Sequence, residues 1–349
     1  MITQSKKPLL LQLSIPFCVR QCSYCSYPFC AYDPQVVRAY ARALWEEIES
    51  CAGEYDDYEI RAISIEGGSP ALLGADELAG ALLRVRRAFS CAASMQISLQ
   101  TMPGQYSRAL MEKMRDAGVN FWIIGLETTQ MEEHEQLNRP YRFDAITMVD
   151  MAVRTFSPRS LSFDLLAGIP GQTEASLEKS MRRCLYYAPE HMTIYPLQSR
   201  EAQPTQEPAS HKATDNGSSK QAKPAQEPAS HKATGNGSAL QAQHAQELAS
   251  FAAQFLADHG FTRYTLYDYG RDGCRNQFRL QKLQGCEYLG LGYHGQSFMD
   301  GVMWKTGRSL QEYLDHPADF AANATNIVRP DEQSLQRIHQ MNQNMLVIM

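Results

Sequence analysis

Residues 9–25 read LLLQLSIPFCVRQCSYC, and this stretch decides what the chain is predicted to be. Residues 9–15 form an apolar, strand-like run, and a C-x3-C-x2-C motif of Cys18, Cys22 and Cys25 follows directly. Three thiolates on so short a loop suit three irons of a [4Fe–4S] cluster, and the fourth iron is then free to bind a small molecule. A structural zinc site needs four closed ligands, and no further His or Cys pair has the usual spacing. The motif therefore predicts an iron–sulfur cluster.

Cysteine usage and charge favour a reduced, cytoplasmic protein. The 349 residues include nine Cys, and Cys30 lies five residues past the third motif cysteine, outside the tight loop. In the cytosol, clustered Cys indicates metal binding rather than disulfides. The apolar run after Lys7 is only of strand length, so we expect neither a secretory signal nor a membrane span. A net charge of −5 with mixed signs predicts no nucleic-acid-binding face.

Up to about residue 198, strand-like runs alternate with amphipathic helical stretches. Strands are predicted at 9–15, 62–66, 95–101, 121–127, 161–167 and 192–197, and helices at 34–51, 75–89, 105–117, 129–137, 143–155 and 173–187. This alternation predicts a parallel sheet with right-handed crossovers. Six repeats are fewer than the eight of a closed barrel. We therefore predict an α/β fold, a partial (β/α)6 TIM-like barrel with a smaller C-terminal α+β extension.

A repeated polar segment interrupts this pattern. QEPASHKATDNGS at 206–218 recurs as QEPASHKATGNGS at 226–238. Such residues bury too little apolar surface to offset chain entropy, so we predict a disordered insertion over 201–242. The expected organisation is a barrel core over 1–200, the insertion, and a region over 243–349 that adds the last barrel elements and is expected to be cut short. A helix at 245–260 and a strand at 263–269 are predicted in that region.

Two glycine turns follow strands of the predicted barrel. Glu66-Gly67-Gly68-Ser69-Pro70 ends the second strand, and GIPGQT at 168–173 ends the fifth. Glycine lets the backbone approach a ligand closely, and the carboxyl edge of a parallel sheet is where α/β folds bind ligands. Either segment alone could be a simple turn. Beside the cysteine loop, they predict a ligand site at this edge.

Taken together, these motifs resemble one known family. Over about 10–200 and 245–315 the chain is similar to the oxygen-independent coproporphyrinogen III oxidases and their heme-chaperone relatives, which are radical S-adenosylmethionine (SAM) proteins. The matching segments are IPFCVRQCSYC, EGGSP, DAGVNFWIIGLET, LNRP, DLLAGIPGQT and YLGLG. The resemblance implies a partial TIM barrel that holds a [4Fe–4S] cluster and S-adenosyl-L-methionine. It also implies an oxidoreductase that forms a 5′-deoxyadenosyl radical, a flavodoxin- or ferredoxin-type electron donor and a tetrapyrrole-like substrate.

The same resemblance implies roles for individual residues. Cys18, Cys22 and Cys25 match the cluster ligands, which form the catalytic centre. The other matching positions are expected to contact SAM: Tyr24, Gly67, Gly68, Ser69, Pro70, Gln100, Arg139 and Asp164. Gln100 stands where the family has a Glu that contacts the ribose, and an amide also hydrogen-bonds a hydroxyl. For Asp164 a structural salt bridge stays an open alternative.

Several positions depart from the family's pattern and bear on the substrate. Gln12 and Ser14 replace a Tyr and a His, and Glu66 replaces the first glycine of GGGTP. Tyr27 stands where the dehydrogenase has a further Cys. Asn276 lies in the stretch that matches the chaperone's heme-ligating His-Asn-x-x-Tyr, so that ligand is missing.

Three functions compete on this basis. The first is a radical SAM enzyme acting on a tetrapyrrole, the second a heme carrier with little catalysis, and the third a methyltransferase that uses a second SAM. Heme is a further candidate cofactor, for which His294 is the only nearby replacement ligand. The missing heme-ligating segment disfavours the carrier, so we favour the enzyme and leave its substrate open.

Overall fold

Strands and helices alternate along the chain much as the sequence predicts. The strands are β1 (Lys7–Ile15), β2 (Phe17–Cys18), β3 (Cys30–Ala31), β4 (Tyr58–Gly67), β5 (Cys91–Thr101), β6 (Phe121–Glu127), β7 (Leu161–Ala167), β8 (His191–Pro196), β9 (Thr262–Arg263), β10 (Asp268–Gly270), β11 (Glu287–Leu291), β12 (Gln296–Met299), β13 (Val302–Thr306) and β14 (Ala324–Val328). The helices are α1 (Pro34–Ser50), α2 (Ala75–Ala88), α3 (Arg108–Asp116), α4 (Met131–Gln136), α5 (Val149–Thr155), α6 (Glu174–Leu185), α7 (Gly235–Asp258), α8 (Gln277–Leu283), α9 (Leu310–Asp315) and α11 (Glu332–Met345), with 3-10 turns η1 (Pro70–Leu73) and η3 (Pro158–Ser160).

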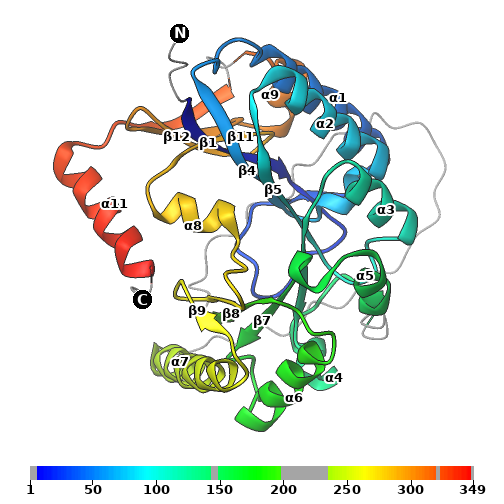
Figure 1. The fold of residues 1–349 in the computed structure, drawn as a ribbon, viewed down its shortest axis with the longest axis vertical. Helices are drawn as coiled ribbons and strands as arrows, with labels where there is room; N and C mark the ends of the chain where they lie inside the picture. Colours follow the sequence, from blue (N-terminus) through cyan, green and yellow to red (C-terminus); the bar gives the residue numbers. More distant parts are fainter. Residues whose placement is uncertain (1–5, 143–147, 198–234, 320–322, 347–349) are drawn as a thin grey trace.

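One large sheet organises the molecule. The computed structural model describes residues 6–142, 148–197, 235–319 and 323–346. Their main sheet has the order β14-β13-β12-β11-β1-β4-β5-β6-β7-β8-β10-β9. From β1 to β8 every pair is parallel, and the connecting helices lie along the outer side of the curved sheet (Figure 1). This confirms the predicted partial TIM-like barrel.

Side chains alternate along the parallel strands and give the sheet one apolar and one polar face. In β1, Leu11 and Leu13 belong to the main core with the outer helices, whereas Gln12 and Ser14 point to the concave side. The other strands place these polar residues on the concave side: Ser64, Glu66, Ser98, Gln100, Ser162, Asp164 and Thr193. Parallel strands are usually apolar on both faces. The polar concave face is therefore the side of the sheet that is suited to contact a ligand.

The C-terminal region extends the same sheet at both ends. β11 pairs in parallel with β1, and β12 to β14 follow it in antiparallel order. At the other end β10 pairs antiparallel with β8. The single strand predicted at 263–269 is wrong, because two short strands, β9 and β10, flank a turn there. The turn is closed by the Thr265 hydroxyl, which accepts from the Asp268 N–H at 2.9 Å.

Helix α7 begins at Gly235, inside the segment 201–242 that is predicted to be disordered. Its residues Ala245 and Leu248 are buried, and the helix packs on β7 and β8. A helix anchored by such packing propagates into the residues that precede the anchor, because extension costs less than nucleation. The helix therefore starts before the predicted boundary at 243. Residues 201–234 lie outside the described residues.

Helix α8 lies on the concave side of the sheet (Figure 1). Its Phe278 packs with Leu10, Ala62 and Tyr288 in a small separate core. Leu10 and Ala62 belong to the first halves of β1 and β4, so α8 covers the part of the concave face that is farther from the carboxyl edge.

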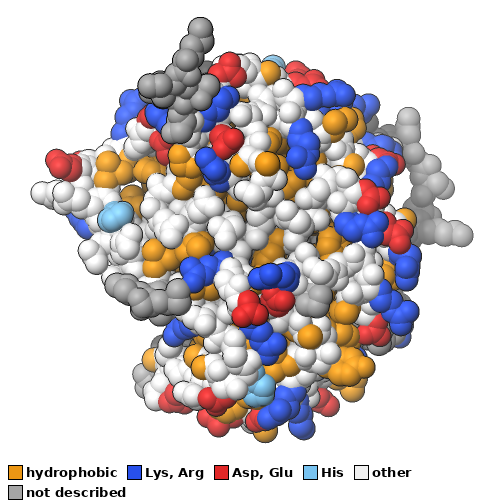
Figure 2. All heavy atoms as spheres, in the orientation of Figure 1, with side chains coloured by type: hydrophobic (Ala, Val, Ile, Leu, Met, Phe, Trp, Pro, Cys, Tyr) orange, Lys and Arg blue, Asp and Glu red, His pale blue; other side chains and the backbone are white. Residues whose placement is uncertain are grey.

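The surface carries both signs of charge. Acidic and basic side chains are interspersed over the face shown in Figure 2, without a field of one sign. Within the described residues, none of the helices combines the length and the apolar character that crossing a bilayer requires.

Candidate functional site

The cysteine loop is held at the carboxyl edge of β1. Cys18 ends β2, which pairs with β3, and its carbonyl accepts from the Tyr32 N–H at 3.1 Å. Inside the loop the Cys25 N–H donates to the Cys22 carbonyl at 3.2 Å. Cys22 is buried, and Cys18 and Cys25 are half-buried. The loop therefore presents its three thiols from one short, hydrogen-bonded turn.

A second segment, residues 136–139, clamps this loop. Ser23 donates its N–H to the Leu137 carbonyl at 3.0 Å, and the Asn138 side chain donates to the Gln21 carbonyl at 3.2 Å. Asn138 has a φ of +49°, a left-handed conformation that Asn tolerates better than most residues. The LNRP segment thus supports the cysteine loop, a contact that sequence reasoning missed.

The three thiols are close enough to influence one another electrostatically. Burial is the main reason that the pKa of the Cys18 thiol rises to about 12, with smaller contributions from Cys25 and Cys22. No three His, Cys, Asp or Glu side chains in the described part of the chain converge on a point that could hold a single metal ion. A [4Fe–4S] cluster takes one thiolate at each of three irons, and three thiols on one loop can supply them.

Two glycines bring the end of β4 against the cysteine loop. The Gly68 N–H donates to the Ile15 carbonyl at 2.8 Å. A Cβ on Gly68 would lie 2.5 Å from the Phe17 carbonyl oxygen and 2.8 Å from the Cys18 Sγ. Gly67 has a φ of +123°, which residues with a Cβ rarely adopt. Only glycine therefore allows this turn to lie against the thiol.

Tyr24, Glu127 and Arg139 form a buried polar group beside the loop. The Tyr24 hydroxyl donates to Glu127 Oε1 at 2.8 Å, and Arg139 Nη1 lies 2.9 Å from the same oxygen. Arg139 also donates to the Tyr24 hydroxyl and lies 3.7 Å from the Cys22 Sγ. Glu127 has a φ of +63°, a costly conformation for a residue with a side chain. Arg139, which is expected at SAM, is thereby connected to Tyr24 and Cys22 of the cysteine loop.

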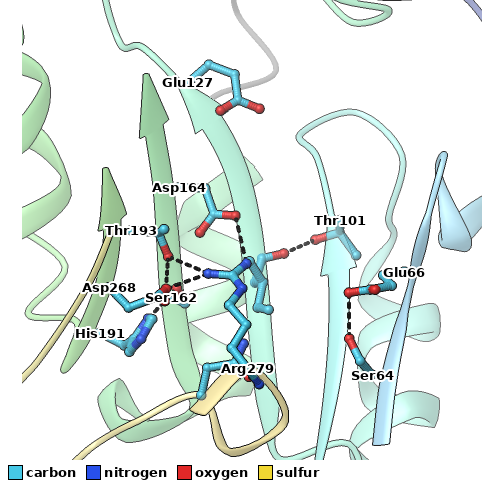
Figure 3. Close-up of polar contacts among 12 residues, drawn as sticks. Ser64, Glu66, Thr101, Glu127, Ser162, Asp164, His191, Thr193, Asp268 and Arg279 are labelled. Atoms are coloured by element: carbon cyan, nitrogen blue, oxygen red, sulfur yellow. Dashed lines mark hydrogen bonds and ion pairs between the residues drawn. The ribbon is translucent and has the colours of Figure 1, made fainter. Parts of the chain in front are cut away.

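Asp164 lies deeper on the concave face, and its carboxyl oxygens accept no hydrogen bond from the described residues. The residue is 2% exposed. Arg279 reaches from α8 to within 4.0 Å of it, but its closest contacts are Asp268 Oδ1 at 2.5 Å and Thr193 Oγ1 at 3.2 Å (Figure 3). Buried polar atoms are normally hydrogen-bonded, so these two oxygens are suited to donors of a ligand.

Comparison with known proteins agrees with this geometry. Residues 13–184 match the family model of the radical SAM superfamily. The chain belongs to the radical SAM superfamily. It is similar to the heme chaperone HemW of Synechocystis, with 27% identity over 88% of this chain and 70% of that protein. The oxygen-independent coproporphyrinogen III oxidase of Bradyrhizobium diazoefficiens is 28% identical over 53% of this chain, and the match spans only 42% of that relative.

A solved structure supports the fold. The coproporphyrinogen III oxidase HemN of Escherichia coli, described as a radical SAM enzyme, superposes with a TM-score of 0.74 over 99% of this chain and 77% of its own, at 17% identity. The chain is thus a HemN/HemW-like radical SAM protein. The superfamily implies a [4Fe–4S] cluster and SAM, and the residues present fit both: three thiols on one loop, a glycine turn against Cys18, and Asp164 oxygens that have no hydrogen bond within the described residues.

The remaining residues predicted for the radical SAM site lie at the same edge. The buried Ser69 hydroxyl is 3.9 Å from the Cys18 Sγ, and Pro70 begins η1 directly after it. Gln100 is half-buried near the carboxyl end of β5. In the GIPGQT turn, Gln172 accepts from the Gly168 N–H at 2.6 Å, which ties the turn to its own strand. These residues therefore lie at the same edge of the sheet as the cysteine loop.

The two residues considered for heme are placed differently. Asn276 caps α8, where its side chain accepts from the Arg279 N–H at 3.0 Å. His294 follows β11 at the carboxyl edge, and its ring lies 3.9 Å from that of Tyr293 and 6.3 Å from that of Tyr27, centroid to centroid. Burial lowers the pKa of His294 to about 4, so the imidazole is neutral near pH 7. Of these two residues, only His294 has a neutral imidazole, the group that ligates heme iron.

Sequence reasoning missed Arg279, Asp268 and Thr193. The available signal was an arginine set between Phe278 and Leu280 in a short helix. A charge set between two buried apolar residues usually has a partner.

Replacing Asp164 by Asn should change how stability depends on pH. Burial is the main reason that the pKa of Asp164 rises from 3.8 to about 7, so between these values the folded protein holds a proton that the unfolded chain releases. The free energy of unfolding of the wild type should therefore fall as pH rises through this window, by about 1.4 kcal/mol for each pH unit, and Asp164→Asn should lack that fall. Urea unfolding at about pH 5 and about pH 8 measures it. Equal pH dependence in the two proteins would show that Asp164 folds ionised.

Proposed function

We propose that this chain binds a [4Fe–4S] cluster through Cys18, Cys22 and Cys25 and cleaves SAM reductively to act on a tetrapyrrole-like substrate. The observation that carries the proposal is the contact between the Gly67-Gly68 turn and Cys18, which places a close-approach turn beside the thiols. When bound, the cluster supplies the electron by which SAM is split into methionine and a 5′-deoxyadenosyl radical. We also propose residues 1–200 as the radical SAM core, which the match over 13–184 supports.

In this proposal the protein's own residues orient SAM and exclude water. Arg139 and Glu127 hold Tyr24 in place by buried hydrogen bonds, so its ring is a fixed wall at the cluster loop. Burial raises the pKa of the Tyr24 hydroxyl well above its usual range, so it stays a donor to Glu127. The Asp164 carboxyl, whose oxygens accept no hydrogen bond from the described residues, would accept hydrogen bonds from hydroxyl or amino groups of SAM, and Gln100 would do so from β5, two strands away from β7 in the sheet.

A heme carrier is the second candidate, favoured by the position of His294 and by relatives named heme chaperone. The neutral imidazole lies at the edge that holds the cysteine loop. The absence of the His-Asn-x-x-Tyr segment disfavours this function. In the matching stretch Asn276 caps α8 and supplies no heme ligand.

One experiment separates the two. The protein, reconstituted without oxygen, is given a strong one-electron donor and SAM, and 5′-deoxyadenosine is quantified; heme is titrated in parallel by its Soret band. We expect SAM cleavage, and weak heme binding that neither His294→Ala nor the exposed control His316→Ala alters. Tight heme binding that His294→Ala alone abolishes, without SAM cleavage, would replace the enzyme by the carrier.

A further inference from the structure

Four residues that depart from the family's pattern contact one another in pairs. Gln12 Nε2 donates to Glu66 Oε1 at 2.6 Å, and Ser14 Oγ lies 2.8 Å from the Tyr27 hydroxyl. Ser14 and Glu66 are register partners in the β1–β4 pair. We call Gln12, Ser14, Tyr27 and Glu66 the β1–β4 wall. Because Ser14 and Glu66 are register partners, the two contacting pairs form one continuous surface.

The wall adjoins the cysteine loop and the glycine turn. Glu66 directly precedes Gly67, and the Tyr27 hydroxyl lies 2.9 Å from the point that a Cβ on Gly67 would occupy. Glu66 and Tyr27 are half-buried, whereas Gln12 and Ser14 are buried beneath them. The parts of the wall that a ligand can reach are therefore a carboxylate and a phenol.

The Glu66 carboxylate is held in place but is not neutralised. Besides Gln12, its second donor is the Ser64 hydroxyl at 2.8 Å, a contact drawn in Figure 3. Both donors are uncharged. Among the residues that the structure describes, no Lys, Arg or His forms an ion pair with it. Lys282 of α8 interacts electrostatically with Glu66, but the Lys282 Nζ lies over the Tyr288 ring, 4.0 Å from its centroid, and makes no ion pair with Glu66. Glu127, by contrast, has Arg139 at 2.9 Å.

From this we infer that the β1–β4 wall selects the substrate by charge. It binds a substrate whose periphery carries hydrogen-bond donors at this wall, and it disfavours a substrate that carries carboxylates there. This inference rests on the proposed function and narrows its substrate to tetrapyrroles with few acidic side chains. A fixed, unpaired carboxylate repels another carboxylate most strongly where protein replaces water around both. Amide or amino groups on the periphery of the macrocycle would instead donate to Glu66.

The test compares three porphyrins that carry two, four and eight carboxylates: mesoporphyrin, coproporphyrin and uroporphyrin. Each is titrated into the reconstituted full-length protein by fluorescence quenching. Glu66→Gln is nearly isosteric, and its amide can still pair with Gln12 and Ser64. The matched control is Glu59→Gln on the same strand, because Glu59 lies at the opposite end and already pairs with Arg61 at 2.9 Å.

We expect wild-type affinity to fall as the number of carboxylates rises. Glu66→Gln should tighten uroporphyrin binding by about tenfold at low salt, less at high salt, and leave mesoporphyrin within about twofold. Glu59→Gln should change none of the three. Equal wild-type affinities, or equal effects of both variants, would overturn the inference. If no porphyrin binds while SAM is still cleaved, the inference falls together with the tetrapyrrole substrate, and reductive SAM cleavage stands; absence of SAM cleavage would instead overturn the proposed function itself.

Discussion

Replacing Cys18, Cys22 or Cys25 by Ala should lower the iron bound per reconstituted chain from about four to near zero, together with all SAM cleavage. Each thiolate binds a different iron, so no remaining ligand can take over its place. The cysteine loop is also short and clamped by residues 136–139, which prevents it from shifting to bring another cysteine into position. Iron and sulfide analysis and the absorbance of the brown protein measure the effect.

Cys30 is the matched control, because it lies near the loop without belonging to the motif. It is half-buried in β3, where burial raises the pKa of its thiol to about 11. Cys30→Ala should keep the iron, and so should Cys274→Ala far along the chain. If Cys30→Ala alone emptied the protein of iron, the assignment of the three ligands would be wrong.

Replacing Arg279 by Met should destabilise the fold by about 3 kcal/mol, the lower end of the cost of leaving a buried charge unpaired, because Arg279 itself is half-buried. Asp268 is 2% exposed and would lose its cation at 2.5 Å. Asp164, equally buried, would lose the positive charge at 4.0 Å. Asp268 would then be a buried carboxylate without a counter-charge, while Asp164 would take up a proton more readily. Equilibrium urea unfolding near neutral pH measures the loss.

Two further variants show whether charge is the cause. Arg87→Met changes an exposed arginine of α2 and should cost no more than about 0.5 kcal/mol. Combining Arg279→Met with Asp268→Asn should recover much of the lost stability, because the buried negative charge is then removed. If the double variant were less stable than Arg279→Met, packing rather than charge would explain the effect of Arg279.

Local features were predictable from the sequence because they depend on neighbouring residues. The spacing of Cys18, Cys22 and Cys25 predicts a cluster loop, and the alternation of strands and helices predicted the parallel barrel that the structure shows. Helix starts followed from their caps: Asp33 accepts from the Gln35 N–H at 2.7 Å at the start of α1. The resemblance to a known family also pointed to Asp164 as a residue of the ligand site.

What those residues meet was decided by the tertiary structure alone. Arg279 is 115 positions from Asp164 in sequence, and the two approach only because β11 and β10 close onto opposite ends of the barrel sheet and carry α8 across its concave face. The pairing of Glu66 with Gln12 likewise needs the register of β1 against β4. Strand register and helix docking are set by packing of the whole core, so the single sequence contains the charges but does not display which of them become neighbours.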